Sequence, residues 1–185
     1  MQSIGATARI RIDGYQRGLR AAADPRLFHA SPEARLPLVR AILAEARACR
    51  AEVVSWDVFD TALLRCARSE LRRFHDLGAA FLAGADAAAL PGPPEAADAL
   101  SARLLAARAA YAMAPPAPDG TREGRHRDIA RLTCEVLGDA ALAPAYVRAE
   151  MEAEAASLAP NPLVAEVMAA PPGARAVYVS DMYLE

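Results

Sequence analysis

The stretch VVSWDVFDTALLR, residues 53–65, decides the fold that the sequence predicts. Residues 52–56 are nearly continuous in apolar character, as expected of a short parallel strand that is covered on both faces. The run then meets Asp57, Asp60 and Thr61. Because an ionised carboxylate is costly to bury without compensation, a strand that ends in such a cluster either caps the next element or holds a reactive group at its tip.

A second apolar run, near the end of the sequence, has the same form. Residues 176–179, AVYV, lead directly into Ser180 and Asp181. Ligands of an open parallel sheet bind beyond the carboxyl ends of its strands, so two neighbouring strands of this kind would place Asp57 and Ser180 in one crevice. A carboxylate there can act as a covalent nucleophile or bind magnesium, and hydroxyls can donate hydrogen bonds to a phosphoryl group. The sequence therefore favours phosphoryl or acyl-like transfer through an aspartyl ester.

The residues between the two strands are patterned as helices separated by proline-rich turns such as PGPP. We expect five helices there, over residues 71–84, 97–114, 125–138, 143–159 and 162–170. The third ends at Gly138, where a left-handed glycine cap is expected. An amphipathic helix is also expected over 32–50. The expected organisation has three parts. Residues 1–50 form an N-terminal helical segment, residues 51–65 and 171–185 form a core in two pieces, and residues 66–170 form a helical insertion.

Composition and charge weigh against several classes of protein. The 185 residues are enough to bury a core, and the formal net charge of -2 gives no reason to expect nucleic acid or an anionic membrane as a partner. Cys49, Cys66 and Cys134 show no metal-ligand spacing and are expected to be reduced thiols. The sequence shows neither a signal-peptide core nor an apolar run long enough to span a bilayer. We expect a soluble cytoplasmic protein.

The two strand tips carry a family resemblance. WDVFDTALLR, residues 56–65, resembles the first motif of the haloacid dehalogenase superfamily, and VYVSDMYLE, residues 177–185, resembles the second. The likeness is closer to a hydrolase-like branch with FDxFDTLL-type and SDMYL-type motifs, to which the EMEAE and PNPLV segments are also similar; it covers roughly residues 50–185. It implies an α/β fold, with a Rossmann-like parallel-sheet core and an inserted α-helical cap that closes over the site.

The resemblance also implies roles for individual residues. Asp57 matches the nucleophile that forms the aspartyl intermediate and helps to hold Mg²⁺. Thr61 matches the threonine that supports the loop, and Ser180 matches the hydroxyl that binds the phosphoryl group. The implied substrate is a small phosphorylated metabolite. A link to enzymes of surface-polysaccharide assembly is implied by the resemblance alone, because members of this branch are often encoded beside them or fused to them.

The sequence departs from the family pattern at two points. Family phosphatases carry a general acid and base two residues after the nucleophile, where this chain has Phe59; Asp60 follows it, and we expect Asp60 to stabilise the loop. The family's lysine motif and final acidic magnesium-binding motif lie on later strands, whereas this sequence ends five residues after Ser180. We therefore expect the front part of a longer protein, with little activity by itself.

Two alternatives to a phosphatase-like hydrolase stay open. One is a catalytically silent member that binds a ligand or partner in the same crevice, which Phe59 favours. The other is a dehalogenase-type displacement at carbon, which needs no magnesium. Asp181 could contact metal or substrate in either enzyme, although a turn role is favoured.

The remaining titratable residues are expected to be structural. Glu150 and Glu154 share one face of a helix at i,i+4 spacing, and we expect that face to be solvated, with Arg148 as an ion-pair partner. A contact between the cap and the core is the alternative that stays open for this face. The three histidines lie far from the strand tips in the sequence, and each is expected at the surface or in helix packing: His29, His75 and His126.

Overall fold

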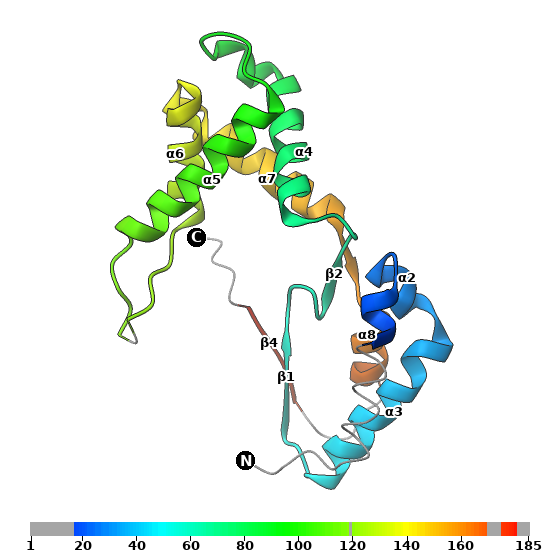
Figure 1. Ribbon diagram of the computed structural model, residues 1–185. Helices are drawn as coiled ribbons and strands as arrows, with labels where there is room; N and C mark the ends of the chain where they lie inside the picture. The colour runs from blue at the N-terminus through cyan, green and yellow to red at the C-terminus, as the bar shows by residue number, and fades with distance from the viewer. Residues whose placement is uncertain (1–16, 119, 170–174, 181–185) are drawn as a thin grey trace. The chain divides into compact units, whose positions relative to one another are not determined.

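The computed structural model describes residues 17–118, 120–169 and 175–180 of a mixed α/β chain. Contacts divide the described chain into two compact units (Figure 1). Unit 1 contains the described residues up to Ala67 and those from Ser157 onward, and unit 2 contains Arg68–Ala156. Among the described residues, no helix combines the length and the apolar composition needed to cross a lipid bilayer.

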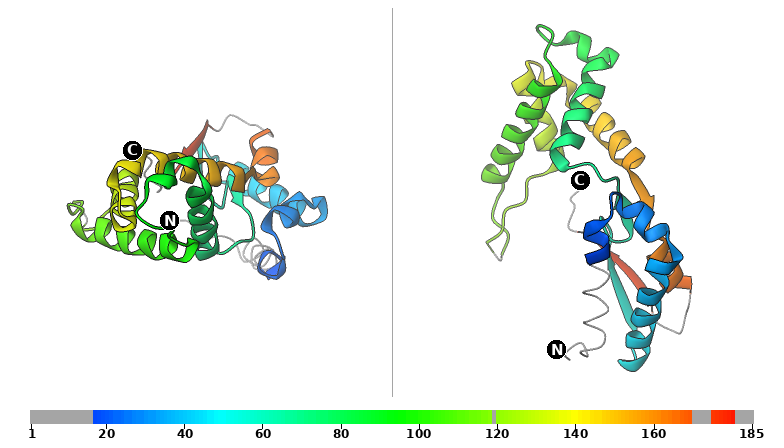
Figure 2. Two further views of the ribbon diagram at one scale, coloured as in Figure 1. Left: turned by 90° about the horizontal axis from the view of Figure 1, so that it is seen from above. Right: turned by 45° about the vertical axis from the view of Figure 1, so that its right-hand side comes forward.

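Unit 1 is built on two short sheets. In the first sheet, β1 (Val53–Asp57) pairs in parallel with β4 (Arg175–Val179). In the second, β2 (Leu63–Arg65) pairs antiparallel with β3 (Leu158–Pro160). Its helices are α2 (Pro25–Ala30), α3 (Pro32–Ala48) and α8 (Pro162–Ala169). Helices α3 and α8 pack side by side (Figure 2). The two strands expected from the sequence are present, and they are neighbours in one parallel sheet.

Helix α3 begins where the sequence signals predict. The Ser31 hydroxyl accepts a hydrogen bond from the Ala34 N–H at 3.4 Å, so it caps one of the donors that a helix start leaves unpaired. Pro32 occupies the first helical position, where the missing N–H costs nothing. The helix ends at Ala48, two residues before the expected end, and the chain reverses at Arg50, whose φ is 52°.

The core of unit 1 lies on one face of β1. Trp56, 8% exposed, packs against Val39 of α3 and Val167 of α8. In contrast, Val53 and Val179, which lie on the opposite face of the sheet, are 48% and 54% exposed. Among the described residues of unit 1, the expectation of a strand covered on both faces is not met, because the helices that cover β1 pack on its Trp56 face.

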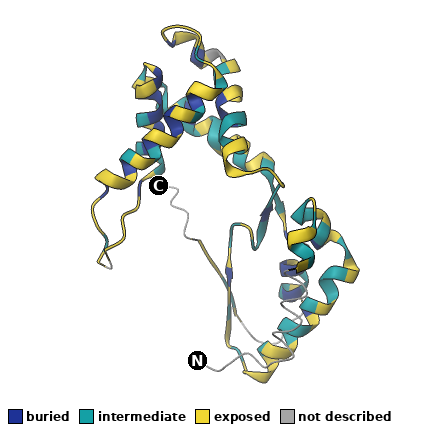
Figure 3. Ribbon diagram, viewed as in Figure 1, coloured by how far each residue is buried: buried dark blue, intermediate teal, exposed yellow. Residues whose placement is uncertain are grey.

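Unit 2 is a bundle of alanine-rich helices, in which residues 114–125 form the longer connection between the third and fourth elements. Its elements are α4 (Glu70–Ala83), η1 (Ala85–Ala89), α5 (Ala96–Met113), α6 (His126–Leu137), η2 (Ala140–Leu142) and α7 (Ala143–Ser157). Buried residues gather where these helices meet (Figure 3). A Cβ at Gly78 would lie 2.7 Å from Ala99 Cβ, so α4 and α5 approach each other closely at this glycine. Gly138 ends α6 with a φ of 111°, as predicted.

Residues 158–160 are the main departure from the expected secondary structure. The sequence predicts helix as far as residue 159, but α7 ends at Ser157 and the following residues pair with β2. The Cys66 N–H donates to the Ser157 carbonyl oxygen at 3.2 Å, which begins the pairing at the end of the helix. Tertiary pairing thus overrides the helix propensity of an alanine-rich segment.

The boundaries of the contact units differ from those expected for the helical insertion. Unit 1 ends at Ala67 and begins again at Ser157, so the residues between them, Arg68–Ala156, form unit 2. Helix α8, which the sequence places inside the block 66–170, packs on α3 and β1 in unit 1. The assignment of the block to an inserted cap stays a prediction.

Glu150 corrects the expectation of a solvated acidic face on α7. Its Oε1 accepts a hydrogen bond from Arg103 Nη2 at 2.9 Å, and its Oε2 lies 2.9 Å from His126 Nε2. The Arg103 guanidinium also lies over the Phe74 ring, 4.6 Å from its centroid. Burial acts to raise the pKa of Glu150, but His126 and Arg103 outweigh it and hold the pKa below its usual value. The expected pairing with Arg148 is replaced, because Arg148 reaches Asp86 at 3.4 Å.

Replacing Glu150 with alanine tests the weight of this buried cluster. We expect Glu150→Ala to lower the free energy of unfolding by about 3 kcal/mol, because the buried Arg103 charge loses its partner. The matched control is Glu152→Ala on the same helix, where the exposed side chain predicts a change within about 0.5 kcal/mol. Urea denaturation followed by circular dichroism measures both, and equal losses would contradict the role of the cluster.

Candidate functional site

The parallel pairing of β1 with β4 brings their carboxyl ends to the same edge of the sheet. Asp57 is in register with Val179, and the Val58 N–H donates to the Val179 carbonyl oxygen at 3.0 Å. Ser180 directly follows the last residue of β4, and both Asp57 and Ser180 are exposed. The neighbouring strand tips that the sequence predicts are therefore present, while Asp181 lies outside the described residues.

The loop after β1 is closed by backbone hydrogen bonds. The Asp57 carbonyl oxygen accepts from the Ala62 N–H at 3.1 Å, and the Val58 carbonyl oxygen accepts from the Leu63 N–H at 2.8 Å. Within this closed loop the Thr61 hydroxyl donates to Asp57 Oδ2 at 3.0 Å. Thr61 therefore restricts the rotation of the Asp57 carboxylate, and the two residues that the sequence singles out are in direct contact.

Asp60 has contacts of the kind expected for loop stabilisation. Its φ is 59°, a left-handed conformation that aspartate tolerates better than most residues. Its Oδ2 accepts a hydrogen bond from Arg65 Nη1 at 2.7 Å, and the side chain is 67% exposed. The Arg65 guanidinium also lies 4.5 Å from the centroid of the Phe59 ring. Arg65 was not singled out from the sequence, because its partners are set by the turn of the loop.

Asn161 is a second residue that sequence reasoning missed. It is 4% exposed and directly precedes α8. Its Nδ2 donates to the Thr61 carbonyl oxygen at 2.8 Å, its Oδ1 accepts from the Leu163 N–H at 3.0 Å, and its own N–H donates to the Ala62 carbonyl oxygen at 2.9 Å. The sequence signal for a helix cap is present, since asparagine precedes proline at the helix start. The contact with Thr61 spans 100 positions and has no local signal.

The chemistry of the Asp57 side chain fits one ligand of a magnesium ion. Magnesium prefers oxygen and is usually held by one or two carboxylates, with water and substrate phosphate completing its shell. Among the described residues, no group of three or more His, Cys, Asp or Glu side chains is placed to hold a metal ion. Asp60, the neighbouring carboxylate in sequence, pairs with Arg65. Among the described residues of this loop, Asp57 is therefore the one whose carboxylate could contribute an oxygen ligand to magnesium.

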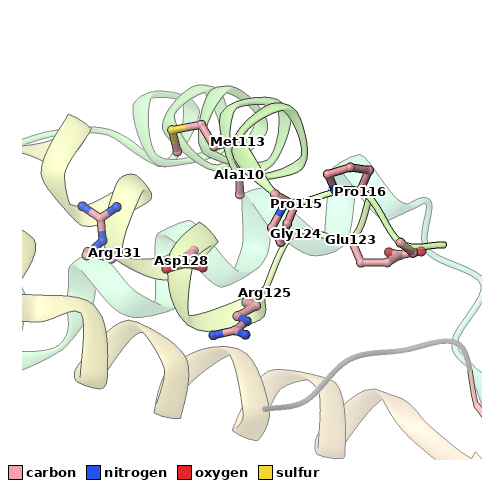
Figure 4. A pocket seen from close by; sticks show the side chains of 11 residues that line it. Ala110, Met113, Pro115, Pro116, Glu123, Gly124, Arg125, Asp128 and Arg131 are labelled. Atoms are coloured by element: carbon pink, nitrogen blue, oxygen red, sulfur yellow. The ribbon is translucent and has the colours of Figure 1, made fainter. Parts of the chain in front are cut away.

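Unit 2 contains a separate open cavity of about 610 Å³. Ala110 and Met113 line it from α5, Asp128 and Arg131 line it from α6, and Arg125, which directly precedes α6, lines it as well (Figure 4). Acidic and basic side chains both line this cavity, so its charge favours neither an anion nor a cation. It contains none of the residues that the sequence predicts for the site.

Comparisons of the chain with family models, with curated proteins and with solved structures find no match. The geometry of the strand tips and the sequence motifs are therefore the observations on which a functional proposal can rest.

Replacing Asp60 tests whether this residue shapes the loop. Asp60→Gly keeps the left-handed backbone, whereas Asp60→Val forces a β-branched residue into it, so we expect valine to cost about 1–2 kcal/mol more unfolding free energy than glycine. Asp60→Asn removes the exposed ion pair alone and should change stability by less than about 1 kcal/mol. Urea denaturation measures all three variants, and equal stability of the glycine and valine variants would count against the loop role.

Proposed function

We propose that the chain is a hydrolase-like member of the haloacid dehalogenase superfamily that transfers a phosphoryl group from a small phosphorylated metabolite to Asp57. The observation that carries the proposal is the parallel pairing of β1 with β4, with Asp57 in register with Val179 and Ser180 directly after it. A carboxylate and a hydroxyl thus follow adjacent strands at one sheet edge, where open α/β sheets bind ligands. A Rossmann-like core and a helical cap belong to the same proposal.

The chemistry assigned to Asp57 is a two-step displacement. An oxygen of the Asp57 carboxylate forms a bond to phosphorus while the bond from phosphorus to the leaving-group oxygen breaks. Water then attacks the phosphorus, which releases inorganic phosphate and restores the carboxylate. The hydrogen bond from Thr61 to Asp57 Oδ2 supports this role, because a carboxylate of restricted rotation is closer to attack geometry before the substrate arrives. Ser180 is assigned to donate a hydrogen bond to a phosphoryl oxygen.

Magnesium belongs to this proposal as an ion bound in part by Asp57. When bound, it would supply positive charge that neutralises the phosphoryl oxygens. The exposed carboxylate of Asp57 supports this assignment, since the ion needs access to water and substrate.

Phe59 is the feature that favours the alternative of a binding protein without turnover. It occupies the position two residues after Asp57, and the Arg65 guanidinium lies over its ring. Phe59 has no proton to give, so the leaving oxygen would take its proton from water. Loss of a positioned acid costs about 10²–10⁴ in rate. A dehalogenase-type displacement at carbon would not need that acid.

Replacing Asp57 separates these functions. We expect Asp57→Asn to lower phosphate release from a panel of phosphate monoesters by about 10³-fold or more, because the nucleophile is lost. Asp60→Asn is the matched control, a carboxylate of the same loop that pairs with Arg65, and should retain activity within about twofold. Colorimetric detection of inorganic phosphate, with magnesium and with chelator, measures both.

Each other result of this assay has a defined meaning. Full activity of Asp57→Asn would overturn the assignment of the nucleophile. Halide release from haloacids that persists in chelator would favour displacement at carbon. Absence of turnover by the natural chain, with phosphate-ester affinity kept or raised in Asp57→Asn, would favour the binding protein.

A further inference from the structure

Asn161 is joined to the loop that carries Asp57 and Thr61 by two hydrogen bonds. Its side-chain Nδ2 donates to the Thr61 carbonyl oxygen at 2.8 Å, and its backbone N–H donates to the Ala62 carbonyl oxygen at 2.9 Å. The residue is 4% exposed, so little water is available to replace these donors. We propose that Asn161 is a positioning residue for Asp57, acting through Thr61; this inference rests on the proposed function of Asp57.

The orientation of the Asn161 amide is fixed by its two partners. Oδ1 faces a donor, the Leu163 N–H at 3.0 Å, and Nδ2 faces an acceptor, the Thr61 carbonyl oxygen. The flipped amide would place oxygen against oxygen and N–H against N–H, and would lose both bonds. An asparagine therefore satisfies both partners at once, while aspartate or serine can satisfy only the helix cap.

Thr61 connects Asn161 to the reactive carboxylate. Its backbone carbonyl is held by Asn161 Nδ2, and its hydroxyl donates to Asp57 Oδ2 at 3.0 Å. Because both bonds belong to one residue, a shift of the Thr61 backbone moves the hydroxyl relative to Asp57. Displacements of about 1 Å at a reacting group can cost about 10²-fold in rate. The proposed role of Asn161 is to prevent such a shift.

The same contacts continue an ordered segment from β3. Leu158–Pro160 pair with Leu63–Arg65, and Asn161 extends this pairing to Ala62 and Thr61. The support of the loop therefore comes from a strand and a buried side chain in one unit of the fold. Sites held by regular elements keep their geometry better than sites held by loops alone.

Asn161→Ser separates positioning from helix capping. Serine is a good N-cap and can keep the bond to the Leu163 N–H, but it cannot supply the amide donor for Thr61. We expect Asn161→Ser to lower kcat by about 10- to 100-fold while KM changes by less than about threefold. Ser31→Ala is the matched control: it removes a helix cap of unit 1 without touching the loop, and should leave kcat within about twofold.

A double-mutant cycle tests the path through Thr61. Thr61→Val removes the hydroxyl that binds Asp57, so the double variant with Asn161→Ser should have a kcat no more than about twofold below the worse single variant. Multiplying losses would overturn the proposal, since the two residues would then act independently. A kcat for Asn161→Ser equal to that of the natural chain would also overturn it.

An NMR measurement separates this inference from the proposed function. In chain labelled with ¹³C at aspartate, the Asp57 carboxyl resonance is assigned by its absence in Asp57→Asn. We expect Thr61→Val and Asn161→Ser to shift this resonance in the same direction, and Ser31→Ala to leave it unchanged. If these shifts are seen in a chain without turnover, they support the positioning role of Asn161, and only the proposed catalytic function is contradicted. A resonance that moves in Thr61→Val but not in Asn161→Ser would overturn the positioning role, with or without turnover.

Discussion

The site and the core of unit 1 depend on one constraint, the parallel pairing of β1 with β4. Five residues of each strand are in register, and further hydrogen bonds flank the pair at both ends, Arg175 N–H to Glu52 O at 2.8 Å and Val58 N–H to Val179 O at 3.0 Å. Parallel strands cannot be joined by a tight turn, so the chain must leave and return between them. The parallel direction and the register of the two strands put Ser180 beside the end of the strand that carries Asp57.

The loop beyond β1 is held by several kinds of contact at once. Backbone hydrogen bonds close it and Asn161 donates to two of its carbonyl groups, while the exposed ion pair between Arg65 and Asp60 adds only a weak contact. Inside this frame Thr61 reaches the Asp57 carboxylate. A reactive group gains from such support because geometry fixed during folding does not have to be found during reaction. The exposed carboxylate of Asp57 is thus presented by a well-bonded loop.

The sequence by itself determined features that depend on local chemistry. Ser31 and Pro32 mark the start of α3, and Gly138 marks the end of α6, because caps act on backbone groups one to four residues away. The apolar runs before Asp57 and Ser180 predict strands, and the strand tips follow from the rule for parallel sheets. The contact between Thr61 and Asp57 is also local, at a spacing of four residues, but the sequence indicated a bond from Thr61 to the backbone and not to this carboxylate.

Only the tertiary structure decided the contacts between distant parts of the chain. Glu150 is four residues before Glu154 on a helix that looks solvated in sequence, yet it forms a partly buried ion pair with Arg103, 47 positions away. Leu158–Pro160 leave the helical pattern because β2 offers them backbone partners. Asn161 finds Thr61 across 100 positions. Caps and periodicity are set by neighbours along the chain, whereas the partner of a buried polar group depends on which segments the fold brings together.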